Sequence, residues 1–235
     1  VNPRASRTIP FIAKATGVPL AKLASLCMVG KRLSELPIPT STQSAYVAVK
    51  ESVFPFARFP GVDVILGPEM KSTGEVMGIS ERFSIAFAKS QLAAGTVLPK
   101  SGKIFISVAE RAKDHIVGLA RRLEKLGYEL LATRGTAERL EAANIRVERL
   151  MKLSQGHPNV LDYMVNGDLQ LVMNTPSGKG ARTDEGRIRA AAVFHGIPCL
   201  TTIQAADAAV LAMEAMREES LAVQAVQDRF PKKNS

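Results

Sequence analysis

The chain has 235 residues, of which 46% are hydrophobic, and a formal net charge of +9 at pH 7. This length is enough for one large hydrophobic core or two small ones. The sequence has no apolar run close to the roughly twenty residues that cross a bilayer, and its first residues are not typical of a signal peptide. Composition therefore favours a globular protein over a membrane protein.

Cysteine usage and charge indicate the cellular compartment of the protein and the kind of ligand it binds. Cys27 and Cys199 lie far apart, with no second ligand at metal-binding spacing, which predicts two reduced thiols in a cytoplasmic protein. Only three Tyr and no Trp are present, so the stacking platforms of nucleic-acid binders are scarce. The basic surplus therefore favours small phosphorylated ligands, and a solvated basic face without a partner is the alternative.

The first hundred residues are irregular in pattern. Apolar spacing predicts helices at about 10–16 and 19–29, and residues 46–50 are typical of a strand. Ser80 is expected to cap a helix that ends at Gly95. With so few strands, this region is interpreted as part of a domain whose partner strands lie elsewhere in the protein.

From Lys103 onward, apolar strands alternate with helices. Strands are predicted at about 104–108, 129–132, 146–151, 169–173 and 198–201. Helices are predicted at about 111–126, 136–143, 158–165, 183–195 and 204–217. This alternation predicts an α/β fold with a parallel sheet covered on both faces.

A break near residues 96–102, which contains Pro99 and Gly102, predicts the domain boundary. The chain is therefore divided into an N-terminal region of residues 1–100, an α/β domain of residues 101–217 and a tail of residues 218–235. The polar end of the tail, from Asp228, is expected to be disordered.

Lysines, small hydroxyl residues and an asparagine follow the strands of the predicted α/β domain. They are Lys113 after the first strand, Thr133, Gly135 and Thr136 after the second, Lys152 after the third, Asn174, Thr175, Ser177 and Lys179 after the fourth, and Thr201 and Thr202 after the fifth. Ligands of open parallel sheets bind beyond the C-terminal strand ends, where helix N-termini favour anions. Each residue alone could cap a helix, turn the chain or face solvent, but their convergence predicts a phosphate site.

Three stretches, in this order, resemble parts of the large subunit of carbamoyl-phosphate synthase. They are Asn2-Pro3-Arg4 with Arg7, the segment LGPEMKSTGEVMG at 66–78, and Asn174-Thr175-Pro176-Ser177-Gly178-Lys179 with Thr133-Arg134-Gly135-Thr136 upstream. The first resembles the closing metal- and phosphate-binding stretch of an ATP-grasp fold. The last resembles the nucleotide-binding loops of a methylglyoxal-synthase-like, Rossmann-like domain. The resemblance covers residues 1–217 and implies the C-terminal part of that subunit.

The resemblance implies an ATP-dependent ligase that makes carbamoyl phosphate from bicarbonate, ATP and glutamine-derived ammonia, for arginine and pyrimidine biosynthesis. It implies ATP with Mg²⁺ or Mn²⁺ as cofactors. The implied partners are the rest of the large subunit and a glutaminase (small) subunit, without nucleic acid or a membrane. Because the carboxylate that normally stands two residues before Asn2 precedes residue 1, the chain is expected to begin inside an active site and to be inactive alone.

Site residues follow from the same resemblance. Asn2 would bind the metal ion, and Arg4 and Arg7 would steady carbamate or phosphate. An allosteric effector such as UMP or IMP would bind around Lys113, Thr133, Thr136, Lys152 and Asn174. Pro176 and Glu185 depart from the pattern of the relatives, and a carboxylate at position 185 would repel a phosphate.

Family members that respond to ornithine bind it where the ATP-grasp tail meets the regulatory domain. The positions that match those contacts are Glu51, Leu66 and Thr201, with Phe54 in place of a usual Leu. In the 66–78 segment, Ser72 or Thr73 is expected to begin a helix. Gly74 and Gly78 are expected to permit close backbone packing.

A methylglyoxal synthase, a lyase acting on dihydroxyacetone phosphate, is the main alternative. It needs a carboxylate base after the third strand, but residues 154–159 carry none. Asp162 falls inside the following helix, and Asp184 is expected to pair with Arg182 and Arg187. His157 is interpreted as a loop-packing residue. A nonspecific anion-binding module is the second alternative.

Overall fold

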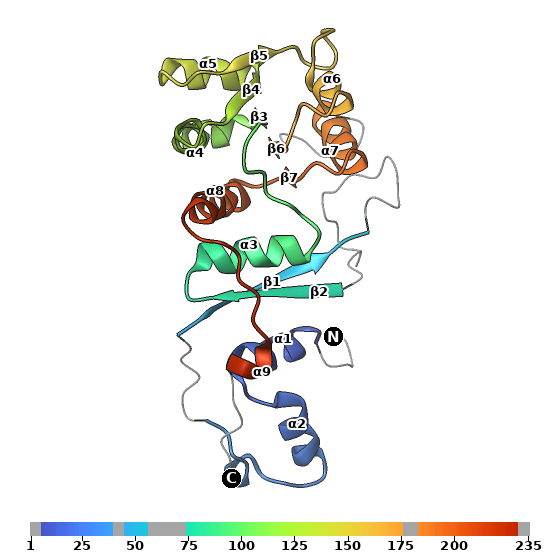
Figure 1. Ribbon diagram of the computed structural model, residues 1–235. Helices are drawn as coiled ribbons and strands as arrows, with labels where there is room; N and C mark the ends of the chain where they lie inside the picture. Colours follow the sequence, from blue (N-terminus) through green and yellow to red (C-terminus); the bar gives the residue numbers. More distant parts are fainter. Residues whose placement is uncertain (1–5, 40–44, 56–73, 176–182, 230–235) are drawn as a thin grey trace.

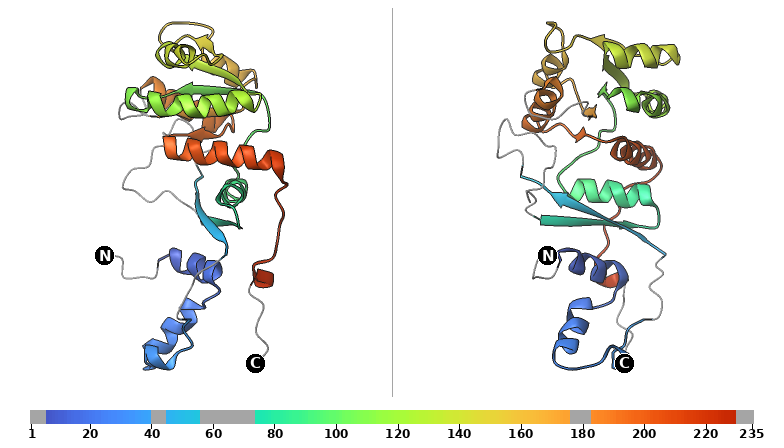
Figure 2. Two further views of the ribbon diagram at one scale, coloured as in Figure 1. Left: turned by 90° about the vertical axis from the view of Figure 1, so that its left-hand side faces the viewer. Right: turned by 180° about the vertical axis from the view of Figure 1, so that it is seen from behind.

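The computed structural model describes residues 6–39, 45–55, 74–175 and 183–229. The molecule is elongated and has three stacked parts (Figure 1). A five-stranded sheet with its helices forms one end, a two-stranded sheet with helix α3 (Phe83–Ala93) lies in the middle, and helices α1 (Thr8–Thr16) and α2 (Leu20–Met28) form the other end. The same order is visible from two further directions (Figure 2).

The five-stranded sheet is parallel throughout. Its strands are β3 (Lys103–Ser107), β4 (Glu129–Thr133), β5 (Glu148–Leu150), β6 (Leu171–Asn174) and β7 (Cys199–Leu200). They lie in the order β5-β4-β3-β6-β7. The predicted α/β class is confirmed. The chain adds β4 and β5 on one side of β3, and then β6 and β7 on its other side. The topological switch point therefore lies between β3 and β6.

Helices cover both faces of this sheet. They are α4 (Lys113–Lys125), preceded by the 3₁₀ turn η3 (Glu110–Ala112), α5 (Arg134–Ala142), α6 (Val160–Val165), α7 (Asp184–Phe194) and α8 (Ile203–Glu218). Each strand and helix predicted from residue 103 onward is confirmed, with ends shifted by a few residues, which is the usual uncertainty of a sequence pattern.

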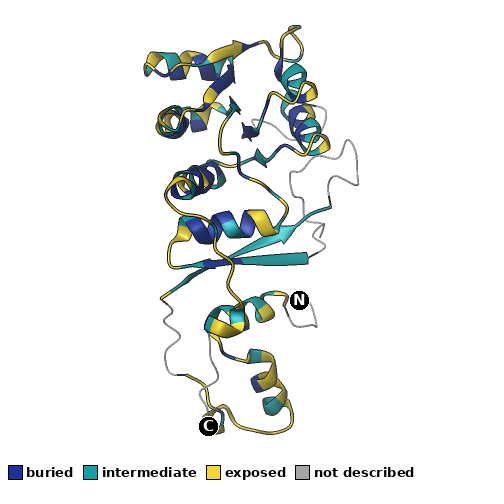
Figure 3. Ribbon diagram, in the orientation of Figure 1, coloured by how far each residue is buried: buried dark blue, intermediate teal, exposed yellow. Residues whose placement is uncertain are grey.

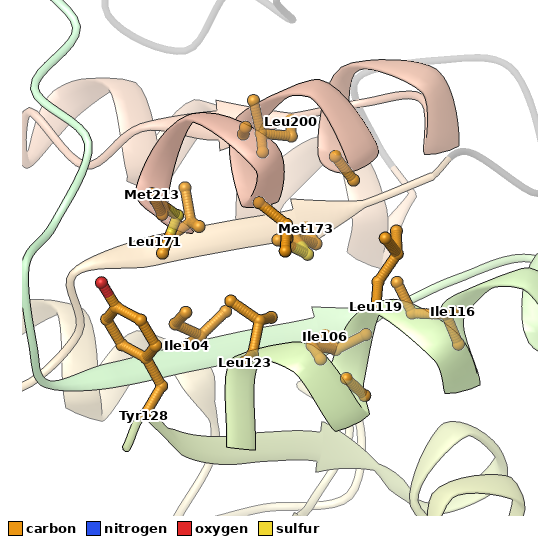
Figure 4. Close-up of a cluster of buried hydrophobic side chains, with 14 of the residues drawn as sticks. Ile104, Ile106, Ile116, Leu119, Leu123, Tyr128, Leu171, Met173, Leu200 and Met213 are labelled. Atoms are coloured by element: carbon orange, nitrogen blue, oxygen red, sulfur yellow. The ribbon is translucent and has the colours of Figure 1, made fainter. Parts of the chain in front are cut away.

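Alternate residues of β3 enter two separate cores, as the two-residue period of a strand requires. Ile104 and Ile106 pack with α4 and α8 residues such as Leu123 and Met213 (Figure 4). Phe105 points to the other face and packs in the cluster of α6 and α7 residues. All three β3 side chains are fully buried, and burial of each contributes about 1.5–3 kcal/mol.

The middle part is an antiparallel pair formed by β1 (Val47–Val53) and β2 (Gly74–Ser80). The strand expected at 46–50 is confirmed, but the helix start expected near Ser72 is wrong for the described part of that segment. Residues from Gly74 onward are extended because they pair with seven residues of β1. Ser80 ends β2, and the residue that precedes α3 is Arg82, so Ser80 is not the cap of that helix.

Gly78 is where α3 packs directly on the backbone of β2. A Cβ atom at this position would lie 1.9 Å from the carbonyl oxygen of Ala86 and 2.5 Å from the amide nitrogen of Ser90. A Cβ at Gly74 would meet no atom of the described chain within 4 Å. Of the two glycines expected to permit close packing, Gly78 does so and Gly74 does not.

Packing continues across the predicted domain boundary near residue 100. Helix α3 packs on α8, and Phe87 and Leu98 belong to the same buried cluster as Ile104. The division at residue 100 stays a prediction, since the two sides share this core.

The end formed by α1 and α2 is thinly packed. Both predicted helices are confirmed, but α1 has no buried residue and α2 has only Leu23. Figure 3 shows the resulting predominance of exposed and half-buried positions there. Within the described ranges, no single helix could cross a membrane by length and hydropathy; α1 and α2 together meet that test but are bent by 115°.

From α8, the C-terminal tail runs past the two-stranded sheet toward the end of the molecule formed by α1 and α2 (Figures 1 and 2). Leu221 packs against the main core, and helix α9 (Val226–Arg229) follows. The guanidinium of Arg229 lies 4.4 Å from the ring centroid of Tyr46, a cation–π distance. The expectation of disorder from Asp228 is therefore wrong for Asp228 and Arg229, and residues 230–235 lie outside the described ranges.

Candidate functional site

Polar side chains meet at the C-terminal edge of the parallel sheet, next to the switch point. Ser107 ends β3 and lies in register with Asn174, which ends β6. The hydroxyl oxygen of Ser107 lies 3.4 Å from that of Thr133 at the end of β4. Three neighbouring strands thus place polar groups side by side at the edge where the sequence predicts a ligand.

Two threonine hydroxyls line the same edge. The backbone amide of Val108 donates to Thr136 Oγ1 at 3.4 Å, and that of Ala109 donates to Thr175 Oγ1 at 2.8 Å. Both threonines are buried. Because each hydroxyl oxygen accepts from the backbone, its proton remains available for a further acceptor, such as an oxygen of an anion.

Lys113 brings a positive charge to this edge from the first position of α4. Its Nζ lies 2.6 Å from Glu110 Oε2, and a Cβ atom at Gly135 would lie only 3.1 Å from the same Nζ. The ammonium therefore lies over the first turn of α5, where backbone amides are unpaired. Glu110 is 86% exposed, so its ion pair contributes little and an anion could displace it.

Lys152 and Thr133 line one cavity of about 260 Å³ with Ser107. Apolar side chains also contribute to the lining, from Met151, Leu153, Val160 and Ile188. The structure therefore brings Lys152 and Thr133 together in one cavity, as the order of the loops predicted. A cavity with a cationic, hydroxyl-rich edge and an apolar wall suits a ligand that joins an anionic group to a flat ring.

Two carboxylates at the start of α7, Asp184 and Glu185, line the same cavity. Acidic residues suit the first turn of a helix, where they face the positive end of its dipole. They share this cavity with Lys152, so Glu185 lies in the site where the sequence predicted a group that opposes phosphate binding. Pro176, the other departure, lies outside the described residues.

The carboxylates considered for the lyase alternative have structural roles. Asp162 Oδ2 accepts from the amide of Asn159 at 2.8 Å and lies 2.7 Å from His157 Nδ1. These hydrogen bonds, the backbone one first, lower the pKa of Asp162, whereas a general base works best with a pKa near the working pH. Asp184 lies 3.8 Å from Arg187, as expected, and Arg182 lies outside the described residues.

A second, larger cavity of about 560 Å³ lies between the middle part and the five-stranded-sheet domain. It brings together Glu51 of β1 and Thr201 after β7, two of the three residues matched to ornithine contacts, along with Phe54. The third, Leu66, lies outside the described residues. Gln91 of α3 donates from Nε2 to Glu51 Oε2 at 2.8 Å.

Burial raises the pKa of Glu51, and the hydrogen bond from Gln91 only partly opposes this. The folded state therefore retains the Glu51 proton at pH values where the unfolded chain has released it. The contribution of Glu51 to stability should decline as pH rises from the ordinary carboxyl pKa of 4.5 through the raised folded value.

We expect Glu51→Gln to flatten this dependence, so that the variant gains stability relative to the unmodified chain as pH rises above about 4.5. Denaturant unfolding at a series of pH values measures the difference. Glu81→Gln, which makes the same change at an exposed carboxylate, is the control for the loss of one negative charge. Parallel curves for Glu51→Gln would contradict the prediction.

Of the predicted N-terminal site residues, Arg7 lies within the described ranges, and it lines neither of these cavities. Arg7 is exposed and directly precedes α1, at the far side of the two-stranded sheet from the parallel sheet (Figure 1). Asn2 and Arg4 lie outside the described residues, so their predicted metal and phosphate roles stay predictions. Within the described part of the chain, no cluster of three His, Cys, Asp or Glu could hold a metal ion. Cys27 and Cys199 are both free thiols, as predicted.

Two residues at the sheet edge were not predicted. Ser107 is the last residue of an apolar strand, a position that the sequence pattern marks as the end where ligands bind. Arg189 lies in α7, is fully buried, and donates from Nη1 to Asn174 Oδ1 at 2.9 Å. Its burial carries no signal in the sequence, because an arginine in a helix is usually solvated.

Comparison with known proteins places this geometry in a family. Residues 115–201 match the MGS-like domain family, so the parallel sheet with its polar edge is an MGS-like α/β domain. The chain is 63% identical over 230 residues to the carbamoyl phosphate synthase large chain of Rhodopirellula baltica and 54% identical over 228 residues to that of Myxococcus xanthus. These matches cover 98% and 97% of this chain.

A third relative is the "carbamoyl phosphate synthase large chain, C-terminal section" of Methanopyrus kandleri, which is 49% identical over 233 residues and of which the chain covers 43%. Over almost its whole length, the chain corresponds to the C-terminal section of carbamoyl phosphate synthase large chains, as the three sequence stretches predicted. It spans about a fifth of the length of the first two relatives, 21% in each case.

Proposed function

We propose that the α/β domain is an effector site that binds a nucleoside monophosphate, such as UMP or IMP. The observation that carries the proposal is the convergence of Lys113, Thr133, Thr136, Lys152 and Asn174 around one edge of the sheet. Lysine charges, hydroxyl protons and helix N-termini all favour a phosphate group there. The apolar wall of the cavity would contact the base.

The intact protein, in this proposal, makes carbamoyl phosphate as an ATP-dependent ligase in the cytoplasm, for arginine and pyrimidine biosynthesis. Support comes from the names of relatives that match almost the whole chain. A glutaminase subunit and the rest of the large chain would be its partners, and ATP with Mg²⁺ or Mn²⁺ would be its cofactors. The described residues would contribute regulation rather than chemistry, so the chain alone is expected to be catalytically silent.

A second candidate ligand is ornithine, in the cavity between the middle part and the α/β domain. The observation that favours it is a half-buried carboxylate, Glu51, facing the same cavity as the hydroxyl-bearing Thr201. An ammonium group would pair with Glu51 and would favour its ionised form. A ligand there would contact both parts of the molecule and so could link them.

Calorimetric titration of the folded chain with UMP and with IMP tests the effector proposal. A specific site should saturate at one nucleotide per chain and should compete with inorganic phosphate. Nonspecific binding by a +9 chain should instead favour long polyanions and weaken steeply as salt is raised. No binding at millimolar nucleotide would contradict the proposal. Production of methylglyoxal from dihydroxyacetone phosphate, lost on changing Asp162 or Asp184, would favour the lyase alternative.

Glu185→Gln should tighten nucleotide binding, because it removes a negative charge from the cavity that Lys152 lines. We expect a gain of a few fold, since a charge in a partly solvated cavity is screened, equivalent to roughly 1 kcal/mol or less. Glu129→Gln at the opposite end of β4 makes the same change in net charge and is the control. Equal gains for both variants would assign the effect to overall charge instead of to the cavity.

A further inference from the structure

The sheet edge contains a buried arginine whose contact decides the orientation of a neighbouring amide. Arg189 of α7 and Asn174 at the end of β6 are both fully buried, and the guanidinium Nη1 donates to Asn174 Oδ1 at 2.9 Å. A guanidinium has only donors, whereas an amide offers an oxygen on one side and an NH₂ group on the other. The contact therefore requires the oxygen to face Arg189 and turns the NH₂ group away from it.

That NH₂ group has no acceptor. Among the described residues, Asn174 Nδ2 is buried and lacks any hydrogen-bond partner. Buried polar groups are almost always paired, so an unpaired one is a cost that a ligand can remove. The neighbours of Asn174 are the groups of the proposed phosphate site: Ser107 in register beside it and Thr175 directly after it.

We propose that Arg189 is a positioning residue of the anion site, which holds the Asn174 amide so that its NH₂ group donates to an oxygen of the bound phosphate. This inference rests on the proposed function. Arg189 does not touch the ligand in this arrangement. It prevents the amide from rotating to present its oxygen, which would repel a phosphate, and its buried charge adds to the positive potential at the edge.

The test is a double-mutant cycle on the binding of UMP, with inorganic phosphate as a second probe. Asn174→Ala and Arg189→Lys are each expected to weaken binding, by about tenfold or more for Asn174→Ala. If Arg189 acts through Asn174, adding Arg189→Lys to Asn174→Ala should produce no further loss. Arg187→Lys, an exposed position on the same helix, is the matched control and should leave affinity unchanged.

The variant Asn174→Asp distinguishes an effect on folding from an effect on ligand binding. A carboxylate at this position would pair with Arg189, so the variant is expected to remain folded by thermal unfolding while losing UMP binding at pH 7. In the unmodified chain, the Asn174 side-chain amide resonance should shift on addition of phosphate, and this shift should shrink in Arg189→Lys.

The outcomes distinguish the two proposals. Failure of the unmodified chain to bind UMP or phosphate would overturn the proposed function. Normal UMP binding with fully additive losses in the cycle, or with an Asn174 amide resonance that does not respond to phosphate, would overturn the positioning role of Arg189 alone. Unchanged affinity in a folded Arg189→Lys variant would do the same.

Discussion

Gly78→Ala is expected to destabilise the folded chain by about 3 kcal/mol or more, at or above the upper end of the usual cost of overpacking. The added Cβ would lie 1.9 Å from the oxygen of Ala86 and 2.5 Å from the nitrogen of Ser90. Both are backbone atoms of α3, so no side-chain rotation can relieve the overlap and the helix must move off the strand. Denaturant unfolding monitored by circular dichroism measures the loss.

Gly74→Ala provides a matched control in the same strand. Its Cβ would have open space among the described residues, so we expect a change within about 0.5 kcal/mol. Because α3 also carries Gln91 and Phe87 into the larger cavity, Gly78→Ala should disturb that cavity as well. Similar stability for the two variants would mean that α3 does not pack on β2 as described.

Lys152→Ala is expected to weaken UMP binding by about 1–3 kcal/mol, the scale of a charge-assisted hydrogen bond to a phosphate. Lys152 is exposed, so its removal should leave the stability of the chain almost unchanged. The loss should therefore appear in the dissociation constant and not in thermal unfolding. Titration calorimetry at fixed ionic strength measures it.

The control for this prediction is Lys125→Ala, an exposed lysine at the opposite end of α4 from Lys113. Both variants lower the net charge of +9 by one, so they should reduce nonspecific polyanion binding equally. Only Lys152→Ala should affect the nucleotide. Equal losses in the two variants would show that the cavity is not the binding site.

Much of the α/β domain could be predicted from local patterns. Its central strands are short apolar runs buried on both faces, as Ile104, Phe105 and Ile106 illustrate, and such runs between helices indicate a parallel sheet. The loops after those strands could be recognised as a candidate site because parallel strands bring their C-terminal ends to one edge. That geometry requires no knowledge of side-chain packing.

The middle part could not be predicted in the same way. The residues from Gly74 to Ser80 form a strand because β1 pairs with them, and β1 lies more than twenty residues earlier in the chain. Local signals around Ser80 resemble a helix cap, but pairing with a distant segment outweighs them. The approach of α3 to Gly78 is likewise a property of the assembled layers.

By itself, the sequence determined the class of fold, the family and the edge of the sheet where a phosphate would bind, since each depends on local periodicity or on motifs. Only the tertiary structure decided which groups complete that edge. Arg189 is an ordinary helical arginine until α7 packs against β6, where its guanidinium meets Asn174 and leaves Nδ2 without an acceptor among the described residues. Glu51 and Thr201 share a cavity because α3 packs against both β1 and α8, and α8 packs against β7. Contacts between segments so distant along the chain have no local signature, because burial and hydrogen-bond partners are set by packing.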